Sequence, residues 1–195
     1  MNVFKNQSAL KPIEKTGELR TIKRLLSPID SNEVQTVRLL GLNYRDHAEE
    51  CGLEIPKQPV LFYKPITSLN NPNDDIPIPN VCKNMIVDYE AEFVAVISKP
   101  AKNVSLDDAL NYVLGYSLGN DISVRKLQFI TSQWGFSKSF DGSAPWGPAL
   151  INAKNVDPQF VPLKCDINDV RLQDSNTSYV MFLSIIIDFS SFEKI

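Results

Sequence analysis

The sequence predicts an α+β fold that is mainly β. Short runs of β-branched and apolar residues recur along the chain, and segments rich in proline, asparagine and aspartate separate them. Apolar runs with helical spacing are few, and strands and helices do not alternate regularly, so a doubly wound sheet is disfavoured. With 195 residues, 43% of them hydrophobic, the chain fits one ordinary domain with a real core.

Three apolar runs predict the main strands. Residues 34–42, 60–63 and 87–97 are rich in valine, leucine, isoleucine and aromatic residues, as buried strands are. The prolines between residues 64 and 79 make that segment a loop with an edge strand, because proline cannot donate to a sheet ladder.

Two helices and a hairpin complete the expected elements. Ser105 followed by Asp108 resembles a capping box and predicts a helix over 106–113. A second helix is expected from just after Asp121 to about residue 132. The alternating segment 164–175 predicts a hairpin that turns at its central Asn-Asp pair.

Composition and charge exclude several classes of protein. A net charge of −3 argues against nucleic acid as a partner, since such a surface must neutralise many phosphates. The longest apolar run, 179–187, is about half the length of a membrane helix. Three widely spaced cysteines and the lack of a secretory leader predict a cytoplasmic protein, with a mitochondrial location as the alternative. Small molecules or proteins are the expected partners.

Two glutamates within the 87–97 run are the first candidates for a functional site. Glu90 and Glu92 are two positions apart, so both would lie on one face of a strand. They are either ordinary solvent-facing residues or part of a hard-cation site completed by a third carboxylate, for which Asp121 is the candidate. Oxygen ligands suit Mg²⁺, Mn²⁺ or Ca²⁺ better than Zn²⁺.

The spacing of Asp121, Arg125 and Gln128 predicts that they share one helical face. A metal ligand, a guanidinium and an amide would then lie side by side, and arginine can grip a carboxylate substrate with two prongs. The alternative is an aspartate N-cap with an i,i+4 partner.

A histidine and a lysine are the remaining candidates. His47, the only histidine, precedes Glu50 by three residues, so the two would meet on a helical turn and the imidazole would accept a proton from water. The alternative is an exposed histidine beside helix-favouring acids. Lys138 lies between aromatic residues and would stabilise an oxyanion if desolvated; otherwise it is an ordinary surface lysine.

Five segments taken in order resemble the fumarylacetoacetate hydrolase family, in particular its small members that carry only the catalytic domain. The resemblance implies a mixed, mainly β sandwich or roll and a homodimer. It extends over roughly residues 25–182 through GLNYRDHAEE (41–50), FYKP (62–65), DYEAEFVAVI (88–97), GYSLGNDISVRKLQ (115–128) and QWGFSKSFDGSAPWGP (133–148).

The resemblance also implies a role for each candidate residue. It implies three carboxylate ligands of a divalent metal, usually Mg²⁺, a water-activating dyad, an oxyanion-stabilising lysine and two residues that contact an oxo-acid substrate. In that order these are Glu90, Glu92 and Asp121; His47 and Glu50; Lys138; and Arg125 and Gln128.

The implied reaction is metal-dependent hydrolysis of a carbon–carbon bond in acylpyruvates or other 1,3-dicarbonyl oxo acids, through a metal-chelated enolate. Oxaloacetate decarboxylation and keto–enol tautomerisation use the same enolate and stand as alternatives.

Domain limits follow from the same resemblance. Residues 1–25 are expected to be a lead-in, 26–182 a partial catalytic domain and 183–195 a tail outside the family, because the family continues after residue 182 with further strands and a TGTP-type segment. Exposed strand edges would make such a domain marginally stable. A catalytically inactive isoform that associates with a full-length subunit is therefore an alternative. Lys126 also departs from the family, which usually has an acid there.

Overall fold

Strands outweigh helices in the structure, a computed structural model that describes residues 17–182. The expected α+β, mainly β fold is therefore confirmed. The strands are β1 (Val37–Gly41), β2 (Val60–Lys64), β3 (Leu69–Asn70), β4 (Val87–Asp88), β5 (Ala91–Ile97), β6 (Val113–Asn120), β7 (Ser123–Val124), β8 (Ala144–Asn152), β9 (Pro162–Ile167) and β10 (Val170–Asn176).

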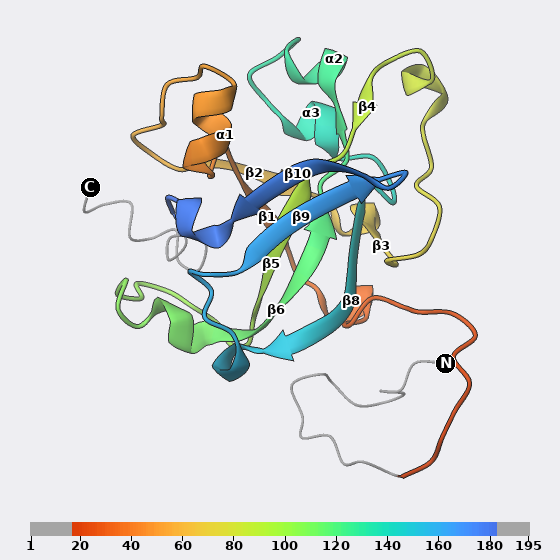
Figure 1. Ribbon diagram of the computed structural model, residues 1–195, viewed down its shortest axis with the longest axis vertical. Coiled ribbons are helices and arrows are strands. Elements are labelled where there is room, and N and C mark those ends of the chain that lie inside the picture. The colour runs from red at the N-terminus through yellow and green to blue at the C-terminus, as the bar shows by residue number, and fades with distance from the viewer. Residues whose placement is uncertain (1–16, 183–195) are drawn as a thin grey trace.

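One four-stranded sheet organises the molecule. Its strand order is β3-β8-β6-β5, with β3 parallel to β8 and the other pairs antiparallel. Three two-stranded pairs accompany it: β1-β2, β4-β7 and β9-β10. The β9-β10 hairpin crosses in front of β5 and β6 (Figure 1), and a hydrogen bond from Ala91 N to Gln173 Oε1 of 2.8 Å ties β10 to the start of β5.

The helices are short, and the three α-helices gather at one end of the four-stranded sheet (Figure 1). In the described range none of them could span the apolar layer of a membrane. They comprise α1 (Arg45–Glu50), α2 (Arg125–Gln128), α3 (Gly135–Lys138) and the 3₁₀ turns η1 (Ser31–Glu33), η2 (Ile66–Ser68), η3 (Asn80–Cys82), η4 (Ala109–Tyr112), η5 (Ala153–Asn155) and η6 (Thr177–Tyr179).

Both predicted helices are wrong in extent. The Ser105 hydroxyl does accept a hydrogen bond from Asp108 N at 3.1 Å, but only η4 follows, because the chain enters β6 at Val113. After Asp121 the chain first forms β7, which pairs with β4, and α2 begins only at Arg125. Tertiary strand pairing therefore overrides the local helical pattern in both segments.

The strand predictions hold with one correction. The 87–97 run is not continuous, since β4 ends at Asp88 and β5 starts at Ala91, which leaves Glu90 in the link between them. β3 lies at the edge of its sheet, as the prolines predicted. The hairpin turns at Asn168 and Asp169, whose φ values of 49° and 63° are those of a two-residue hairpin turn.

Two packing clusters support the two ends of the β5-β6 region, and the second lies at the end that carries the candidate residues. Val113 and Tyr116 of β6 are buried with Val104 and Ala109, and the Tyr116 ring stacks on Phe93 of β5 at 4.9 Å. A second cluster joins Val124 and Leu127 to Cys82 and Met85. Cys82 is buried there, and it, Cys51 and Cys165 are all free thiols.

Trp134, the residue before α3, packs against the β1-β2 pair. Its ring meets Phe62 of β2 edge to face, with centroids 5.9 Å apart. A Cβ atom added to Gly41 of β1 would lie 1.7 Å from Trp134 Cζ3, so only glycine leaves room for the ring. This contact fixes where α3, and with it Lys138, sits on the sheet.

We expect Gly41→Ala to lower the free energy of unfolding by at least about 1–3 kcal/mol, the usual cost of overpacking. Gly135→Ala is the matched control, because its added Cβ would meet nothing closer than Ser139 Oγ at 3.5 Å. Urea unfolding of both variants checks this. Equal stability of Gly41→Ala and the wild type would show that Trp134 does not depend on the gap.

Candidate active site

The β5-β6 pair brings the three candidate carboxylates together. Glu90 and Glu92 flank the first residue of β5, and Asp121 follows directly after the last residue of β6. Because the strands are antiparallel, these ends adjoin, and Asp121 N donates to Glu90 O at 2.8 Å. Glu90 N in turn donates to the side chain of Asn120 at 3.1 Å. Two carboxylates 31 residues apart in sequence, Glu90 and Asp121, are thus backbone neighbours.

Lys138 bridges two of these carboxylates. Its ammonium donates to Glu90 Oε2 at 2.6 Å and to Asp121 Oδ2 at 2.8 Å. A third hydrogen bond of 2.6 Å reaches Ser123 Oγ, so all three N–H groups have partners. The side chain is 2% exposed, so Lys138 is desolvated rather than an ordinary surface lysine.

Arg125 and Gln128 lie beside this cluster. Arg125 donates from Nη1 to Glu90 Oε1 at 2.5 Å and from Nε to Asp88 Oδ2 at 2.7 Å. Nη1 also donates to Gln128 Oε1 at 2.9 Å, so the predicted neighbours do meet. They share α2, but Asp121 does not, and the prediction of one helical face for all three is wrong.

Lys64 is a buried member of the cluster that the sequence analysis missed. Its ammonium donates to Asp121 Oδ1 at 2.7 Å and to Ser143 O at 3.1 Å, with a longer contact of 3.4 Å to Ile122 O. The side chain is fully buried, and this burial lowers the pKa of Lys64, which Asp121 opposes. Lys64 stands two positions after the buried Phe62 on β2, a spacing that predicts an inward side chain.

Two further polar residues were also missed. Ser123 carries the hydroxyl that accepts from Lys138, and Gln173 carries the amide oxygen that accepts from Ala91 N. Both depend on contacts between distant parts of the chain. Neither sequence neighbourhood carries a signal that would have singled them out.

Glu92 is the third carboxylate and has no direct cationic partner in the described structure. Within residues 17–182 its side chain forms no hydrogen bond or ion pair. Burial raises the pKa of Glu92 well above its ordinary value, and the nearby charges of Asp121 and Glu90 raise it further. The charge of Lys138 opposes this rise in the pKa only in part. Three carboxylates therefore interact electrostatically in one place, and one of them has no direct ion pair.

The donor chemistry of this cluster fits a hard divalent cation, because carboxylate oxygens are the ligands that Mg²⁺, Mn²⁺ and Ca²⁺ prefer. As the side chains stand in the described part of the chain, no three histidine, cysteine, aspartate or glutamate side chains form a metal-ligating group. The ammonium of Lys138 lies between two of the three carboxylates instead. The carboxylate oxygens fit such an ion, but in this structure Lys138 binds two of the carboxylates and fixes their positions.

His47 and Glu50 both lie on α1, and both are exposed. No hydrogen bond or ion pair joins them in the range that the structure describes, and the nearest recorded partner of the imidazole is Cys51 Sγ at 3.8 Å. α1 nevertheless begins beside the carboxylates. Burial raises the pKa of Tyr44, the residue before α1, and the charge of Glu92 adds to this shift.

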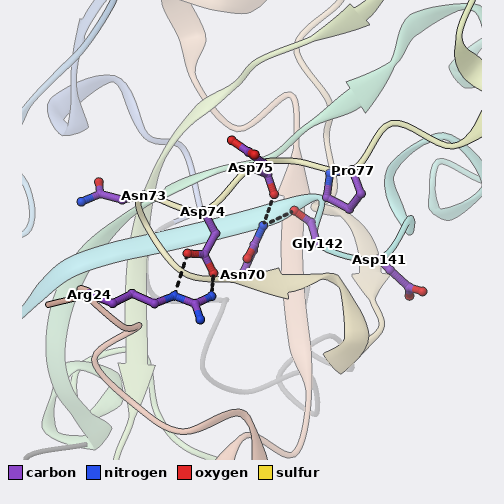
Figure 2. Close-up of a pocket in the computed structure, with 8 residues that line it drawn as sticks. All are labelled: Arg24, Asn70, Asn73, Asp74, Asp75, Pro77, Asp141 and Gly142. Carbon is purple, nitrogen blue, oxygen red and sulfur yellow. Dashed lines mark hydrogen bonds and ion pairs between the residues drawn. The ribbon is translucent and has the colours of Figure 1, made fainter. Parts of the chain in front are cut away.

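A hollow of about 500 Å³ (Figure 2) is lined by residues outside the cluster, among them Gly142. Some of its polar groups pair with one another, since Arg24 pairs with Asp74 and Asn70 Nδ2 donates to Gly142 O at 3.3 Å. The next residue, Ser143, is the one that binds Lys64. None of the clustered carboxylates or lysines lines this open hollow, so the chemistry favours the cluster as the candidate site. The hollow is lined by Arg24, Asn70, Asn73, Asp74, Asp75, Pro77, Asp141 and Gly142.

Lys64→Met is expected to lower the free energy of unfolding by about 2–3 kcal/mol. The loss stays below the full cost of breaking a buried pair, because Lys138 still neutralises Asp121. Lys154→Met, at an exposed lysine, should change stability by less than about 0.5 kcal/mol. Denaturant titration compares the two, and similar losses would exclude a special role for Lys64.

Glu92→Gln is expected to flatten the pH dependence of stability when no divalent metal is present. The raised pKa of Glu92 means that the folded state holds a proton that the unfolded state releases near pH 4.5, so stability falls as pH rises from there to the folded pKa. The variant should lose that fall and match or exceed the wild type at neutral pH. Unfolding from pH 4 upward, with the exposed Glu54→Gln as control, measures it; an unchanged slope would contradict it.

Comparison with known proteins places this cluster in a family. Residues 36–190 match the family described as fumarylacetoacetate (FAA) hydrolase C-terminal. Caffeoylpyruvate hydrolase of Neonothopanus nambi is 56% identical over 123 residues, which are 62% of this chain and 43% of that protein. The mitochondrial oxaloacetate tautomerase of Xenopus laevis is 37% identical over 161 residues, 81% of this chain and 49% of that protein.

A solved structure supports the same family. The crystal structure of 5-carboxymethyl-2-hydroxymuconate delta-isomerase from Mycobacterium smegmatis superposes with a TM-score of 0.73 at 36% identity, covering 84% of this chain and 63% of that one. The chain spans about half the length of these relatives. The matched region contains every candidate residue from His47 to Lys138, and the chain belongs to the fumarylacetoacetate hydrolase family.

Proposed function

We propose that this protein is a divalent-metal-dependent enzyme that hydrolyses a carbon–carbon bond in acylpyruvate-type oxo acids. The observation that carries the proposal is the cluster itself: three interacting carboxylates, a desolvated lysine that bridges two of them, and an arginine–glutamine pair at its side. Relatives named as a caffeoylpyruvate hydrolase and an oxaloacetate tautomerase support this substrate class.

Arg125 and Gln128 are suited to hold the carboxylate of the substrate. In the described structure Nη2 of Arg125 and Nε2 of Gln128 have no hydrogen-bond partner, whereas Nε and Nη1 of Arg125 are fixed by Asp88 and Glu90. The anchored guanidinium thus presents spare N–H donors in a fixed orientation, and the amide stands next to it. Such pre-set donors bind an oxo-acid carboxylate with little loss of side-chain entropy.

Glu90, Glu92 and Asp121 would hold the divalent cation, Mg²⁺ in the first instance and Mn²⁺ or Ca²⁺ as alternatives. When bound, the cation would supply Lewis acidity toward the oxygens of the dicarbonyl group.

The remaining steps fall to side chains of this chain. His47 takes the proton from the attacking water, Glu50 orients the imidazole, and Lys138 places positive charge at the acyl oxygen as its negative charge develops. The carbon–carbon electrons leave with the pyruvate fragment, which is then protonated. Exposure leaves the side chains of His47 and Glu50 free to turn toward bound substrate.

Oxaloacetate tautomerisation is the second candidate function, favoured by the 37% identity to a protein named for that activity. Tautomerisation, like decarboxylation of oxaloacetate, needs no attacking water, and so it depends on the carboxylates and Arg125 rather than on His47. We also propose that the protein acts as a homodimer, which sedimentation of the purified chain tests.

Activity of the full chain on an acylpyruvate and on oxaloacetate, with Mg²⁺ and with chelator, tests the proposal. We expect His47→Ala to lower acylpyruvate hydrolysis by about 100-fold or more, the usual contribution of a general base, and to leave tautomerisation intact. Glu90→Ala should abolish both. Glu49→Ala, an exposed glutamate on the same helix as His47, is the matched control.

Equal rates in the wild type, His47→Ala and Glu90→Ala would refute the assigned roles. If the folded wild type turned over neither substrate with Mg²⁺, the catalytically inactive alternative would stand in place of the proposed enzyme.

A further inference from the structure

The carboxylate oxygens of the cluster are divided among three cations in an orderly way. Glu90 gives Oε1 to Arg125 and Oε2 to Lys138, while Asp121 gives Oδ1 to Lys64 and Oδ2 to Lys138. Lys138 is therefore the one cation in the described structure that occupies an oxygen on both carboxylates. Its withdrawal would free one oxygen on each, and every other ion pair would remain.

Glu92 adds a third available group. Its carboxylate has no hydrogen bond or ion pair in residues 17–182, and Glu92 pairs with Gly119 across the β5-β6 ladder, two residues before Asp121. With Lys138 withdrawn, three carboxylates would each offer one oxygen. Three single carboxylate oxygens leave room for water or substrate around a six-coordinate ion such as Mg²⁺.

The proposed catalytic role of Lys138 also requires that its ammonium leave the carboxylates. An ammonium has three N–H groups, and here all three are used, by Glu90, Asp121 and Ser123. A lysine in this state cannot donate to an oxyanion. To act on substrate, Lys138 must first give up at least one carboxylate.

We propose that Lys138 is an exchangeable counter-ion of the carboxylate cluster: a divalent cation displaces its ammonium from Glu90 and Asp121, and the displaced ammonium becomes available to the substrate. This inference deepens the proposed function and rests on it for the metal. Lys64 does not exchange. It stays on Asp121 Oδ1 and holds that carboxylate in place in both states.

The surroundings of the two lysines explain this difference. Lys64 ends β2, and the backbone carbonyl of Ser143 holds its ammonium together with Asp121. Lys138 ends the four-residue helix α3. Among residues 17–182 its ammonium contacts only side-chain oxygens and the face of the Phe62 ring, whose centroid is 5.2 Å away. The Ser123 hydroxyl and the ring face can retain a cation after the carboxylates are lost.

Trace acetylation of the wild-type protein with and without Mg²⁺ tests the exchange directly. Lysine reactivity is read peptide by peptide by mass spectrometry at constant ionic strength, and Mg²⁺ binding is measured separately by calorimetry. We expect Mg²⁺ to raise labelling of Lys138 several-fold, while the buried Lys64 stays protected and the exposed Lys154 stays unchanged. Protection of Lys138 that persists with Mg²⁺ bound would overturn the exchange.

The Mg²⁺ affinity of two lysine variants is an independent test, because the two substitutions should change it in opposite directions. Lys138→Met removes the competing cation and should tighten Mg²⁺ binding by well over tenfold, because a unit charge about 4 Å away at an effective dielectric near 20 corresponds to about a thousandfold. Lys64→Met should weaken binding, because Asp121 loses its anchor, and Lys154→Met should leave it unchanged. Weaker binding by a folded Lys138→Met would show that Lys138 supports the ion rather than competes with it.

The outcomes separate this inference from the proposed function. Mg²⁺-dependent turnover with Lys138 still protected would retain the enzyme and remove the exchange. A folded protein that binds no Mg²⁺ would overturn the exchange and the metal-dependent function together.

Discussion

The neutralisation of Asp121 is the constraint on which the rest of the site depends. Its side chain is 2% exposed, and an isolated carboxylate in that position would cost several kcal/mol. The ammonium groups of Lys64, at the end of β2, and Lys138, at the end of α3, together offset that cost. Ser143 joins the two lysines, since its carbonyl accepts from Lys64 and its hydroxyl donates to the Lys138 carbonyl at 2.9 Å. One acidic side chain thereby holds strand ends and a helix that are distant in sequence in a single arrangement.

The same network neutralises its three carboxylates unevenly, and the least neutralised one is the group suited to bind a ligand. Asp121 and Glu90 are saturated by cations, whereas Glu92 is crowded by like charge and lacks a partner in the described structure. A fold selected for stability alone would pair or replace such a glutamate. Groups that are unfavourable in the resting protein and satisfied by a ligand are typical of functional sites.

Local patterns in the sequence were sufficient for β1, β2, the β4-β5 segment, the edge position of β3, the β9-β10 hairpin and the mainly β class, but not for β6 and β8, the two central strands of the four-stranded sheet. They failed where pairing across the chain decided the outcome. The segment after Asp121 has helical spacing, but Ser123 and Val124 pair with β4 before α2 begins. Lys64 was overlooked for a related reason: a lysine at the end of a strand is usually solvated, and its burial is explained only by Asp121, 57 residues further along the chain. The grouping of the three carboxylates was expected from the family resemblance, and their engagement with two lysines was not.

The three carboxylates lie at the adjoining ends of β5 and β6, opposite the loop that connects those strands. The length of that loop therefore does not affect the geometry of the site. Residues 98–112 leave and re-enter the sheet at its far end, so insertions there would extend a surface loop and leave the carboxylates where they are. A single residue inserted within β5 would do the opposite. It would reverse the inward and outward alternation of every following or preceding side chain and turn Glu92 away from Asp121. Length variation is therefore tolerated at one end of this hairpin and forbidden at the other.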